Sequence, residues 1–237
     1  MITINIFSDF ACPWCYIGEK RLEDAIDKLG IEGQVNIGYR AFELNPGAPK
    51  VSEGNTAERM AKKYNLSVDV AKRRVEQIDN AGKACGIEGF NFSGVKPANT
   101  FDAHRLMKLA EAAYGPVVIE KLNHSLFDAY FVKNLVISDT KILTDLGVAA
   151  GMDQTDIQNL FEGDQYKEDV INDENIAKNL GITGVPYFII NDQIAVPGAI
   201  STEDFIDALK HILAEDSMKE EKGSSCAVCD DTGCHIN

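Results

Sequence analysis

Within the first 45 residues, the spacing of hydrophobic residues changes from every second position to helical spacing and back again. Ile2, Ile4 and Ile6 alternate with polar residues, and this period of two predicts a strand. A helix follows, and Gly30 is suited to end it. Its expected buried face carries Leu22, Ala25, Ile26 and Leu29. A second strand is expected over about residues 35–42, which gives the order β-α-β.

From about residue 46 the apolar residues take helical spacing, and they keep it to about residue 182. Strand character returns at residues 187–190, and residues 194–196 form a short partner strand. The last helix begins at Ser201-Thr202-Glu203-Asp204, whose spacing resembles a capping box. The predicted order is therefore β-α-β, a long helical insertion, and then α-β-β-α.

The segment after Ala214 is polar and has no apolar stripe. We expect residues 216–237 to form a flexible tail that contains three cysteines. Three interpretations of this tail stay open. Cys229 and Cys234 form a second redox pair, or Cys226, Cys229, Cys234 and His235 bind zinc, or the tail is only solvated.

The charge of the chain excludes two classes of partner. With a formal net charge of −14, the chain lacks the excess of Lys and Arg that nucleic acid binding needs, and an anionic membrane surface is disfavoured too. No apolar run approaches the roughly 20 residues of a membrane-spanning helix. The N-terminus has no basic region and no small-residue cleavage site, so we expect a cytoplasmic protein. Thiols there stay mostly reduced, so the six cysteines indicate chemistry rather than a disulfide framework.

Cys12-Pro13-Trp14-Cys15 is the strongest chemical signal, because it follows a strand and opens a helix, with Pro13 suited to the first turn. A helix N-terminus stabilises a thiolate, and thiols so placed have pKa values of roughly 3.5–7.5. Cys12 is therefore the expected solvent-accessible nucleophile, and Cys15 the shielded resolving thiol. The alternatives are a zinc half-site, for which no second ligand pair is expected nearby, and a structural pair of cysteines.

Three segments occur in a characteristic order: residues 8–18 (Ser-Asp-Phe-Ala-Cys-Pro-Trp-Cys-Tyr-Ile-Gly), 99–106 (Asn-Thr-Phe-Asp-Ala-His-Arg-Leu) and 181–188 (Gly-Ile-Thr-Gly-Val-Pro-Tyr-Phe). Together they resemble the FrnE-type branch of the DsbA family. The resemblance implies an α/β, thioredoxin-like domain with a large all-α insertion. The expected boundaries are 1–45 and 171–215 for the two parts of the thioredoxin-like domain, 46–170 for the insertion and 216–237 for the tail.

The resemblance also implies site residues. The Val185-Pro186 bond is expected to be cis and to face the dithiol, with Pro186 taking part in catalysis. Trp14 and Val185 are expected to contact the substrate. Asn99, His104 and Arg105 are expected to line a substrate groove between the insertion and the core.

Several of these polar residues have a second interpretation. His104 and Arg105 are equally compatible with helix residues that satisfy their hydrogen bonds inside the insertion. Asp9 is either a proton relay to the dithiol, if it is partly buried, or a loop carboxylate that caps local N–H groups. Cys85 ends an apolar helical seam, so core packing is expected for it.

The predicted function is that of a thiol–disulfide oxidoreductase, which oxidises, reduces or isomerises disulfides of protein or small thiol substrates. Glutathione is a candidate partner, and no cofactor or metal is expected at the dithiol. Two alternatives stay open. Kappa-class glutathione transferases and hydroxychromene-carboxylate isomerases share the expected fold, but they have a serine where Cys12 stands. A substrate-binding holdase would keep its full activity without the dithiol.

Overall fold

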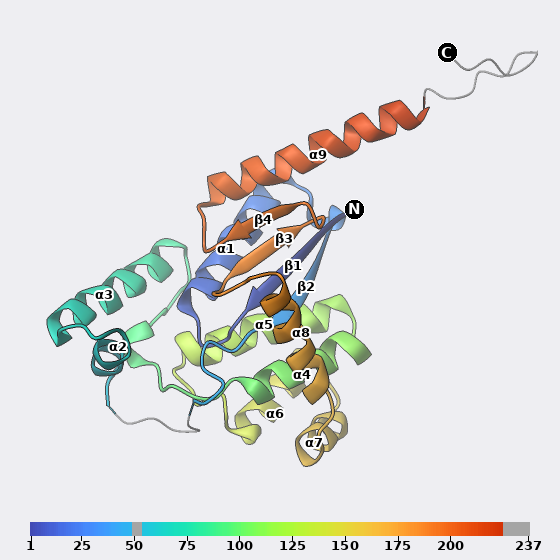
Figure 1. Cartoon of the computed structure of the whole chain (residues 1–237). Coiled ribbons are helices and arrows are strands. Elements are labelled where there is room, and N and C mark those ends of the chain that lie inside the picture. Colours follow the sequence, from blue (N-terminus) through green and yellow to red (C-terminus); the bar gives the residue numbers. More distant parts are fainter. Residues whose placement is uncertain (49–53, 225–237) are drawn as a thin grey trace, which may run out of the picture.

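The computed structural model describes residues 1–48 and 54–224, which contain a mixed sheet in the order β2-β1-β3-β4 (Figure 1). The strands are β1 (Ile2–Ser8), β2 (Val35–Ala41), β3 (Tyr187–Ile190) and β4 (Ile194–Pro197). β1 pairs in parallel with β2 and antiparallel with β3, so Ile4 lies between Ile37 and Ile190. β3 and β4 pair antiparallel. The first and last strands of the sequence are thereby joined in one sheet.

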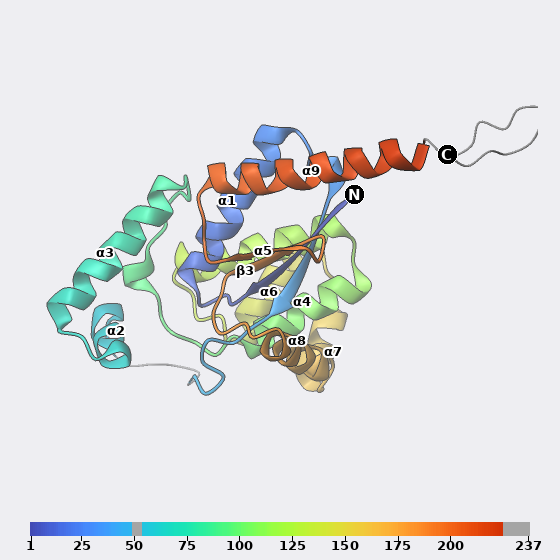
Figure 2. The ribbon, with the colours of Figure 1, turned by 45° about the horizontal axis from the view of Figure 1, so that its top comes forward.

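Two helices cover one face of this sheet. α1 (Pro13–Leu29) packs against α9 (Thr202–Ser224), and both lie along the strands (Figures 1 and 2). The buried cluster that they share with the sheet includes Ile2, Ile4, Ile6, Leu22, Phe188 and Phe205. The period of two in β1 thus places its isoleucines on the face that α1 and α9 cover.

The opposite face of β1 carries Phe7. This side chain packs with Ala177 of α8 (Lys167–Asn179) and with Ile182 in the segment that follows. The alternation along β1 therefore buries both faces of the strand, because helices lie on each side of it.

The described chain between β2 and β3 forms helices that are joined by loops. Its helices are α2 (Thr56–Tyr64), α3 (Val68–Ala84), α4 (Phe101–Ala113), α5 (Pro116–Phe131), α6 (Thr140–Ala150), α7 (Gln154–Glu162) and α8 (Lys167–Asn179), and short 3-10 helices lie at Phe92–Gly94 and, before β2, at Glu32–Gln34. α4 contacts α5, α6, α7 and α8, and α8 also contacts β2. The expected boundary at residue 170 falls inside α8, and the division into domains stays a prediction.

The predicted order of elements is confirmed. The prediction of a flexible linker after Ala214 is wrong for the residues up to 224, which are helical. α9 continues to Ser224 and extends past the sheet in both views (Figures 1 and 2). Met, Lys and Glu, which make up residues 218–222, have high helix propensity, so this segment continues the helix without an apolar stripe. The tail residues Cys226, Cys229, Cys234 and His235 lie outside the described residues. No helix in the described part of the chain is long and apolar enough to span a bilayer.

Candidate active site

Cys12 lies at the N-terminus of α1, immediately before Pro13, the first residue of the helix. Its backbone is extended (φ −96°, ψ 112°), and its N–H donates to the carbonyl of Asp9 over 2.9 Å. The N–H of Cys15, in the first turn, donates to the carbonyl of Cys12 over 3.1 Å. Cys12 is thus the N-cap residue of α1, at the end of the helix where the dipole favours negative charge, although its side chain makes no capping hydrogen bond.

The segment before β3 contacts the Cys12 thiol. The Val185–Pro186 peptide bond is cis, and the thiol of Cys12 donates a hydrogen bond to the carbonyl oxygen of Val185 over 3.5 Å. Pro186 is itself buried. The prediction that this bond is cis and lies beside the dithiol is confirmed.

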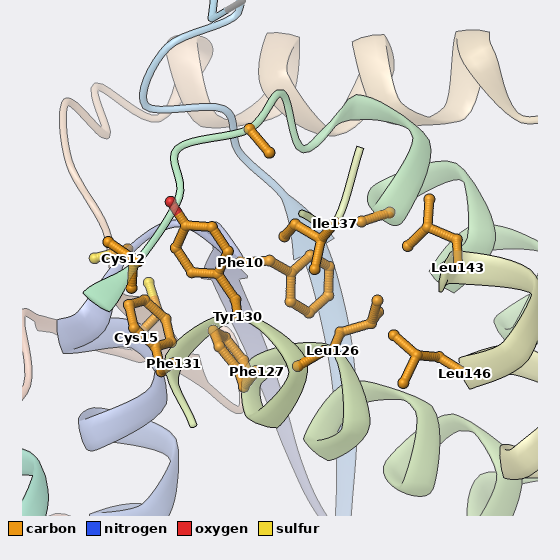
Figure 3. Packing of buried hydrophobic residues seen from close by; sticks show 14 of the residues in the cluster. Phe10, Cys12, Cys15, Leu126, Phe127, Tyr130, Phe131, Ile137, Leu143 and Leu146 are labelled. Carbon is orange, nitrogen blue, oxygen red and sulfur yellow. The ribbon is translucent and has the colours of Figure 1, made fainter. Parts of the chain in front are cut away.

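The expectation that Cys12 is solvent-accessible is wrong for this structure. Cys12 is 3% exposed and Cys15 is 0% exposed. Both thiols belong to the buried cluster of the helical region, and Figure 3 shows them at one end of it, beside Tyr130 and Phe131. Cys12 is covered because Val185 packs against the same cluster. Cys15 is the more shielded thiol, as expected.

Two large apolar side chains near the dithiol are exposed. Trp14, between the cysteines, and Leu44, in the loop after β2, are each 39% exposed. The N–H of Leu44 is hydrogen-bonded to Asp9, whose carbonyl in turn accepts from Cys12. The covered thiol of Cys12 is thus accompanied by apolar surface on the first turn of α1 and on the loop after β2.

The surroundings of Cys15 oppose its ionisation. Burial raises the pKa of Cys15 well above its ordinary value, and the hydrogen bond and charge of Cys12 act in the same direction. Hydrogen bonds from the backbone of Asp9 and from the side chain of Ser8 lower it. The thiol of Cys15 is therefore protonated near neutral pH.

Asp9 fixes the loops around the dithiol. Its carboxylate is 1% exposed and accepts hydrogen bonds from the N–H of Ala11 over 2.9 Å and of Leu44 over 2.7 Å. Burial raises the pKa of Asp9, whereas these bonds and one from Thr100 lower it. The geometry favours the interpretation of Asp9 as a carboxylate that caps local N–H groups.

His104 does not line an open groove. It is 4% exposed, and its ring centroid lies 5.0 Å from that of Phe10. Burial lowers the pKa of His104 to about 3, so the ring is neutral near neutral pH. Its Nε2 atom lies 3.9 Å from Oδ1 of Asp9 and has no hydrogen-bond partner among the described residues. The groove position expected for His104 does not hold here, because α4 packs its ring under the dithiol loop.

The side chain of Asn99 makes hydrogen bonds to the loop after β2. The amide of Asn99 donates to Oε1 of Glu43 over 3.3 Å and to the carbonyl of Pro46 over 3.2 Å, so it connects the start of α4 to the loop after β2. Burial and the charge of Glu174 raise the pKa of Glu43 to about 7.

Arg105 donates to three backbone carbonyl groups, those of Leu160, Gly163 and Gln165. Arg105 is therefore a satisfied helix residue, the second of its two interpretations.

A buried polar network, which the sequence interpretation missed, adjoins Cys15. Glu19 of α1 is 4% exposed. Its Oε1 accepts from the hydroxyl of Ser8 over 3.0 Å, and its Oε2 accepts from the amide of Asn123 over 2.6 Å. Burial raises the pKa of Glu19 to about 7, although the hydrogen bonds from Asn123 and Ser8 lower it. The available signal was position, since Glu19 follows Cys15 by four residues and precedes Leu22 by three, on the buried face of α1.

Cys85 is half-buried rather than a core residue. It follows α3 and packs at the margin of the cluster that includes the dithiol. The guanidinium of Arg21 donates to its sulfur over 3.3 Å and also to the carbonyl of Ala199 over 2.8 Å. Cys85 is a free thiol.

Comparison with known proteins assigns the fold. The family described as DSBA-like thioredoxin domain matches residues 3–210. The protein YwbO of Bacillus subtilis, whose function is uncharacterised, is 26% identical over 215 residues, which cover 88% of this chain and 96% of YwbO. The crystal structure of a probable DsbA oxidoreductase from Streptomyces coelicolor is 28% identical, has a TM-score of 0.80 and covers 100% of both chains. The predicted fold, a thioredoxin-like domain with a large helical insertion, is confirmed.

A more distant structure shares the fold. It is the cytosolic disulfide reductase DsbM from Pseudomonas aeruginosa, solved with GSH, which is 14% identical with a TM-score of 0.57 and covers 90% of this chain and 99% of its own.

Proposed function

The chain belongs to the family of DSBA-like thioredoxin domains, and from this premise we propose that it is a thiol–disulfide oxidoreductase whose reactive dithiol is Cys12 and Cys15. The observation that carries the proposal is the position of Cys12. It lies at the N-terminus of α1, and its thiol is 3.5 Å from the carbonyl oxygen of Val185. A helix N-terminus stabilises the thiolate that disulfide exchange requires.

In the proposed reaction, the Cys12 thiolate attacks one sulfur of a substrate disulfide and expels the other sulfur as a thiolate. Cys15 then attacks Sγ of Cys12 in the mixed disulfide, and the bond from Cys12 to the substrate breaks. The substrate gains two electrons, and the dithiol loses two as the Cys12–Cys15 disulfide forms. The same steps in reverse oxidise a dithiol substrate.

We propose protein disulfides or thiols with neighbouring apolar residues as the substrates. The exposed Trp14 and Leu44 supply apolar contact surface beside Cys12, and Val185 and Pro186 border the thiol. Asn99, which is partly exposed, is retained as a proposed contact. Glutathione is the proposed small-thiol partner, since the DsbM structure of the same fold contains GSH. In the cytoplasm expected from the sequence, the dithiol would rest in its reduced form.

Reduction of insulin disulfides tests this proposal. Cys12→Ser is expected to abolish the activity, because the attacking sulfur is lost. Cys15→Ser is expected to trap a mixed disulfide on Cys12, visible as a mass adduct that dithiothreitol removes. Cys85→Ser is the matched control and is expected to keep the wild-type rate. Full activity of Cys12→Ser would overturn the proposal and favour a holdase, whereas a glutathione-dependent activity that survives in Cys15→Ser would favour a transferase.

The tail pair Cys229 and Cys234 remains part of the proposal as a second redox couple that exchanges with Cys12 and Cys15. Because α9 reaches Ser224, only five positions separate the end of the helix from Cys229, fewer than the linker predicted from the sequence. The double variant Cys229→Ser/Cys234→Ser is expected to slow multiple turnover while Cys12 stays reactive. If the double variant turns over at the wild-type rate, two interpretations of the tail remain. One is zinc binding, measured as bound metal that a chelator removes, and the other is a solvated tail.

A further inference from the structure

Tyr130 of α5 is a buried tyrosine whose hydroxyl is unpaired within the described part of the chain. The residue is 3% exposed, and its ring packs edge-on against Phe131, with 4.9 Å between the ring centroids. Asn134 donates to its backbone carbonyl over 3.1 Å, but the hydroxyl makes no hydrogen bond with any of the described residues. The hydroxyl of a buried tyrosine usually has a partner. That of Tyr130 is free to donate to a group from outside the chain.

This hydroxyl keeps contact with solvent although the ring is buried. Within residues 1–48 and 54–224, the only fully buried side-chain nitrogen or oxygen without a partner is Nε2 of His104. The unpaired hydroxyl of Tyr130 is therefore not fully buried, and it reaches the surface at the edge of the cluster. A substrate can approach it there.

The hydroxyl of Tyr130 lies on the side of the dithiol. Tyr130 and Cys12 belong to the same buried cluster, and Figure 3 shows the hydroxyl at the end of the cluster that holds Cys12. Burial raises the pKa of Tyr130, the charge of Asp9 raises it further, and the charge of Arg59 in α2 lowers it. Asp9 also accepts the hydrogen bond from the N–H of Cys12. The hydroxyl, Asp9 and Cys12 are therefore neighbours.

A tyrosine in this setting acts as a hydrogen-bond donor. Because the pKa of Tyr130 is raised, the phenol keeps its proton at neutral pH. A thiol has an ordinary pKa of about 8.5, so a thiolate beside the phenol does not remove its proton. It accepts a hydrogen bond instead, and hydrogen bonds to charged acceptors are the stronger kind.

The position of the hydroxyl favours a sulfur of the substrate over that of Cys12. In the described structure the thiol of Cys12 pairs with the carbonyl of Val185 and not with Tyr130. During exchange the attacking, central and leaving sulfurs lie nearly in line. The leaving sulfur is then roughly 4 Å or more from Sγ of Cys12, since one S–S bond measures about 2.05 Å. A donor that neighbours Cys12 without binding it is suited to a sulfur at this outer position.

We propose that the hydroxyl of Tyr130 donates a hydrogen bond to the substrate sulfur that leaves when Cys12 attacks a disulfide. The Cys12 sulfur bonds to the nearer substrate sulfur, and the substrate S–S bond breaks. The farther sulfur leaves as a thiolate with the bonding electron pair, and it later takes a proton from water, while Tyr130 keeps its own. This inference rests on the proposed function, because it adds a donor to the first step of the same reaction.

Reagents that differ in the group they expel test this role. The experiment uses the full chain with Ser in place of Cys15, Cys85 and the three C-terminal cysteines, so that Cys12 is the single thiol. Bis(hydroxyethyl) disulfide expels a basic alkyl thiolate. Dithiobis(nitrobenzoate) expels a thiolate that its aromatic ring already stabilises, and iodoacetamide expels no sulfur at all. The mass of the Cys12 adduct, followed against time, gives the rate with each reagent.

Tyr130→Phe removes the hydroxyl and keeps the ring. Its reaction with bis(hydroxyethyl) disulfide is expected to be about tenfold slower, because a hydrogen bond to a charged sulfur is lost. The loss should be much smaller with dithiobis(nitrobenzoate) and absent with iodoacetamide. The midpoint of urea unfolding should not change, since the hydroxyl binds none of the described residues.

Tyr114→Phe is the matched control in the same helical region. The hydroxyl of Tyr114 donates to Asp156 over 2.6 Å, at the end of α4 that is farther from the dithiol loop. This variant is expected to keep the parent rate with all three reagents.

Equal slowing of Tyr130→Phe with all three reagents would overturn the inference, because Tyr130 would then act on Cys12 or on the packing of the site. Parent rates with all three reagents would overturn it too. A parent chain that reacts with iodoacetamide and with neither disulfide would instead contradict the proposed function on which the inference rests, so the two failures are distinguishable.

Discussion

Gly18 of α1 and Pro186 approach each other so closely that a Cβ atom at position 18 would lie 3.3 Å from Cγ of Pro186. The same Cβ atom would meet Phe188 at 3.2 Å and Ala199 at 3.3 Å. Gly18→Ala is therefore expected to displace the segment that borders Cys12. Overpacking costs about 1–3 kcal/mol, and the helix propensity of alanine offsets about 1 kcal/mol of it, so we expect a small loss of stability and a clear loss of exchange rate.

Urea unfolding and the rate of insulin reduction measure the two effects of Gly18→Ala. Gly33→Ala is the matched control, since a Cβ atom there would meet nothing within 4 Å. The control is expected to keep the wild-type rate. An unchanged rate in Gly18→Ala would show that the position of Pro186 does not depend on this contact.

The two thiols of the dithiol are expected to differ in reactivity. Alkylation of the reduced, folded protein by iodoacetamide should label Cys12 first. Cys12 lies at the helix N-terminus, and its thiol is next to the segment around Val185 that covers it. Cys15 should be labelled only after denaturation, since it is fully buried and its pKa is raised. Peptide mass mapping at increasing times distinguishes the two sites. Equal labelling of both thiols in the folded protein would contradict the assignment of nucleophile and resolving thiol.

The sequence predicted those parts of the site that local patterns determine. Cys12 and Cys15 follow a strand and open a helix, and this could be inferred from the spacing of apolar residues and from Pro13. The position of Pro186 beside Cys12 followed only from the resemblance, because 173 positions separate Cys12 from Val185.

The burial of Cys12 and His104 could not be inferred from local patterns, because it depends on which distant segments cover each side chain. The network around Glu19 is of the same kind, since Ser8, Glu19 and Asn123 come from β1, α1 and α5. The length of α9 was missed for another reason. Its last turns are favoured by helix propensity and not by an apolar stripe.

A buried ion pair joins α4 to α8 and is expected to be costly to break. Nζ of Lys108 lies 2.7 Å from Oδ2 of Asp173, and the side chains are 10% and 2% exposed. Asp173 also accepts from the guanidinium of Arg40 and from the N–H of Ala41. Asp173→Ala is expected to lower the free energy of unfolding by about 3–5 kcal/mol, because Lys108 loses a buried partner.

The exposed pair of Lys141 and Asp145 on α6 provides the contrast. Its side chains are 81% and 66% exposed and lie 2.8 Å apart. Asp145→Ala is expected to unfold in urea at the same midpoint as the wild type, within error, because solvent screens the pair. A loss for Asp173→Ala no larger than that for Asp145→Ala would contradict the structural role assigned to Asp173.

The stability of the protein is expected to carry the signature of the buried carboxyl of Glu19. Its pKa is about 7 in the folded state, against about 4.3 in an unfolded chain. Between these values the folded state binds more protons than the unfolded state. The contribution of Glu19 to the free energy of unfolding therefore increases as pH falls through this range. Above about pH 7 the group is ionised in both states, and the cost of its burial is present in full.

Glu19→Gln replaces this carboxyl by an uncharged amide of nearly the same shape. The variant is therefore expected to gain stability relative to the wild type at about pH 8, and the gain should shrink towards about pH 5, where the folded wild type holds Glu19 protonated. His104 acts in the opposite sense, since its lowered pKa weakens the fold as pH falls below about 6.5. Both chains contain His104 and Glu43, so these contributions cancel in the difference between variant and wild type. Urea unfolding of both chains at the two pH values measures that difference, and a difference that does not vary with pH would show that Glu19 titrates at its ordinary pKa.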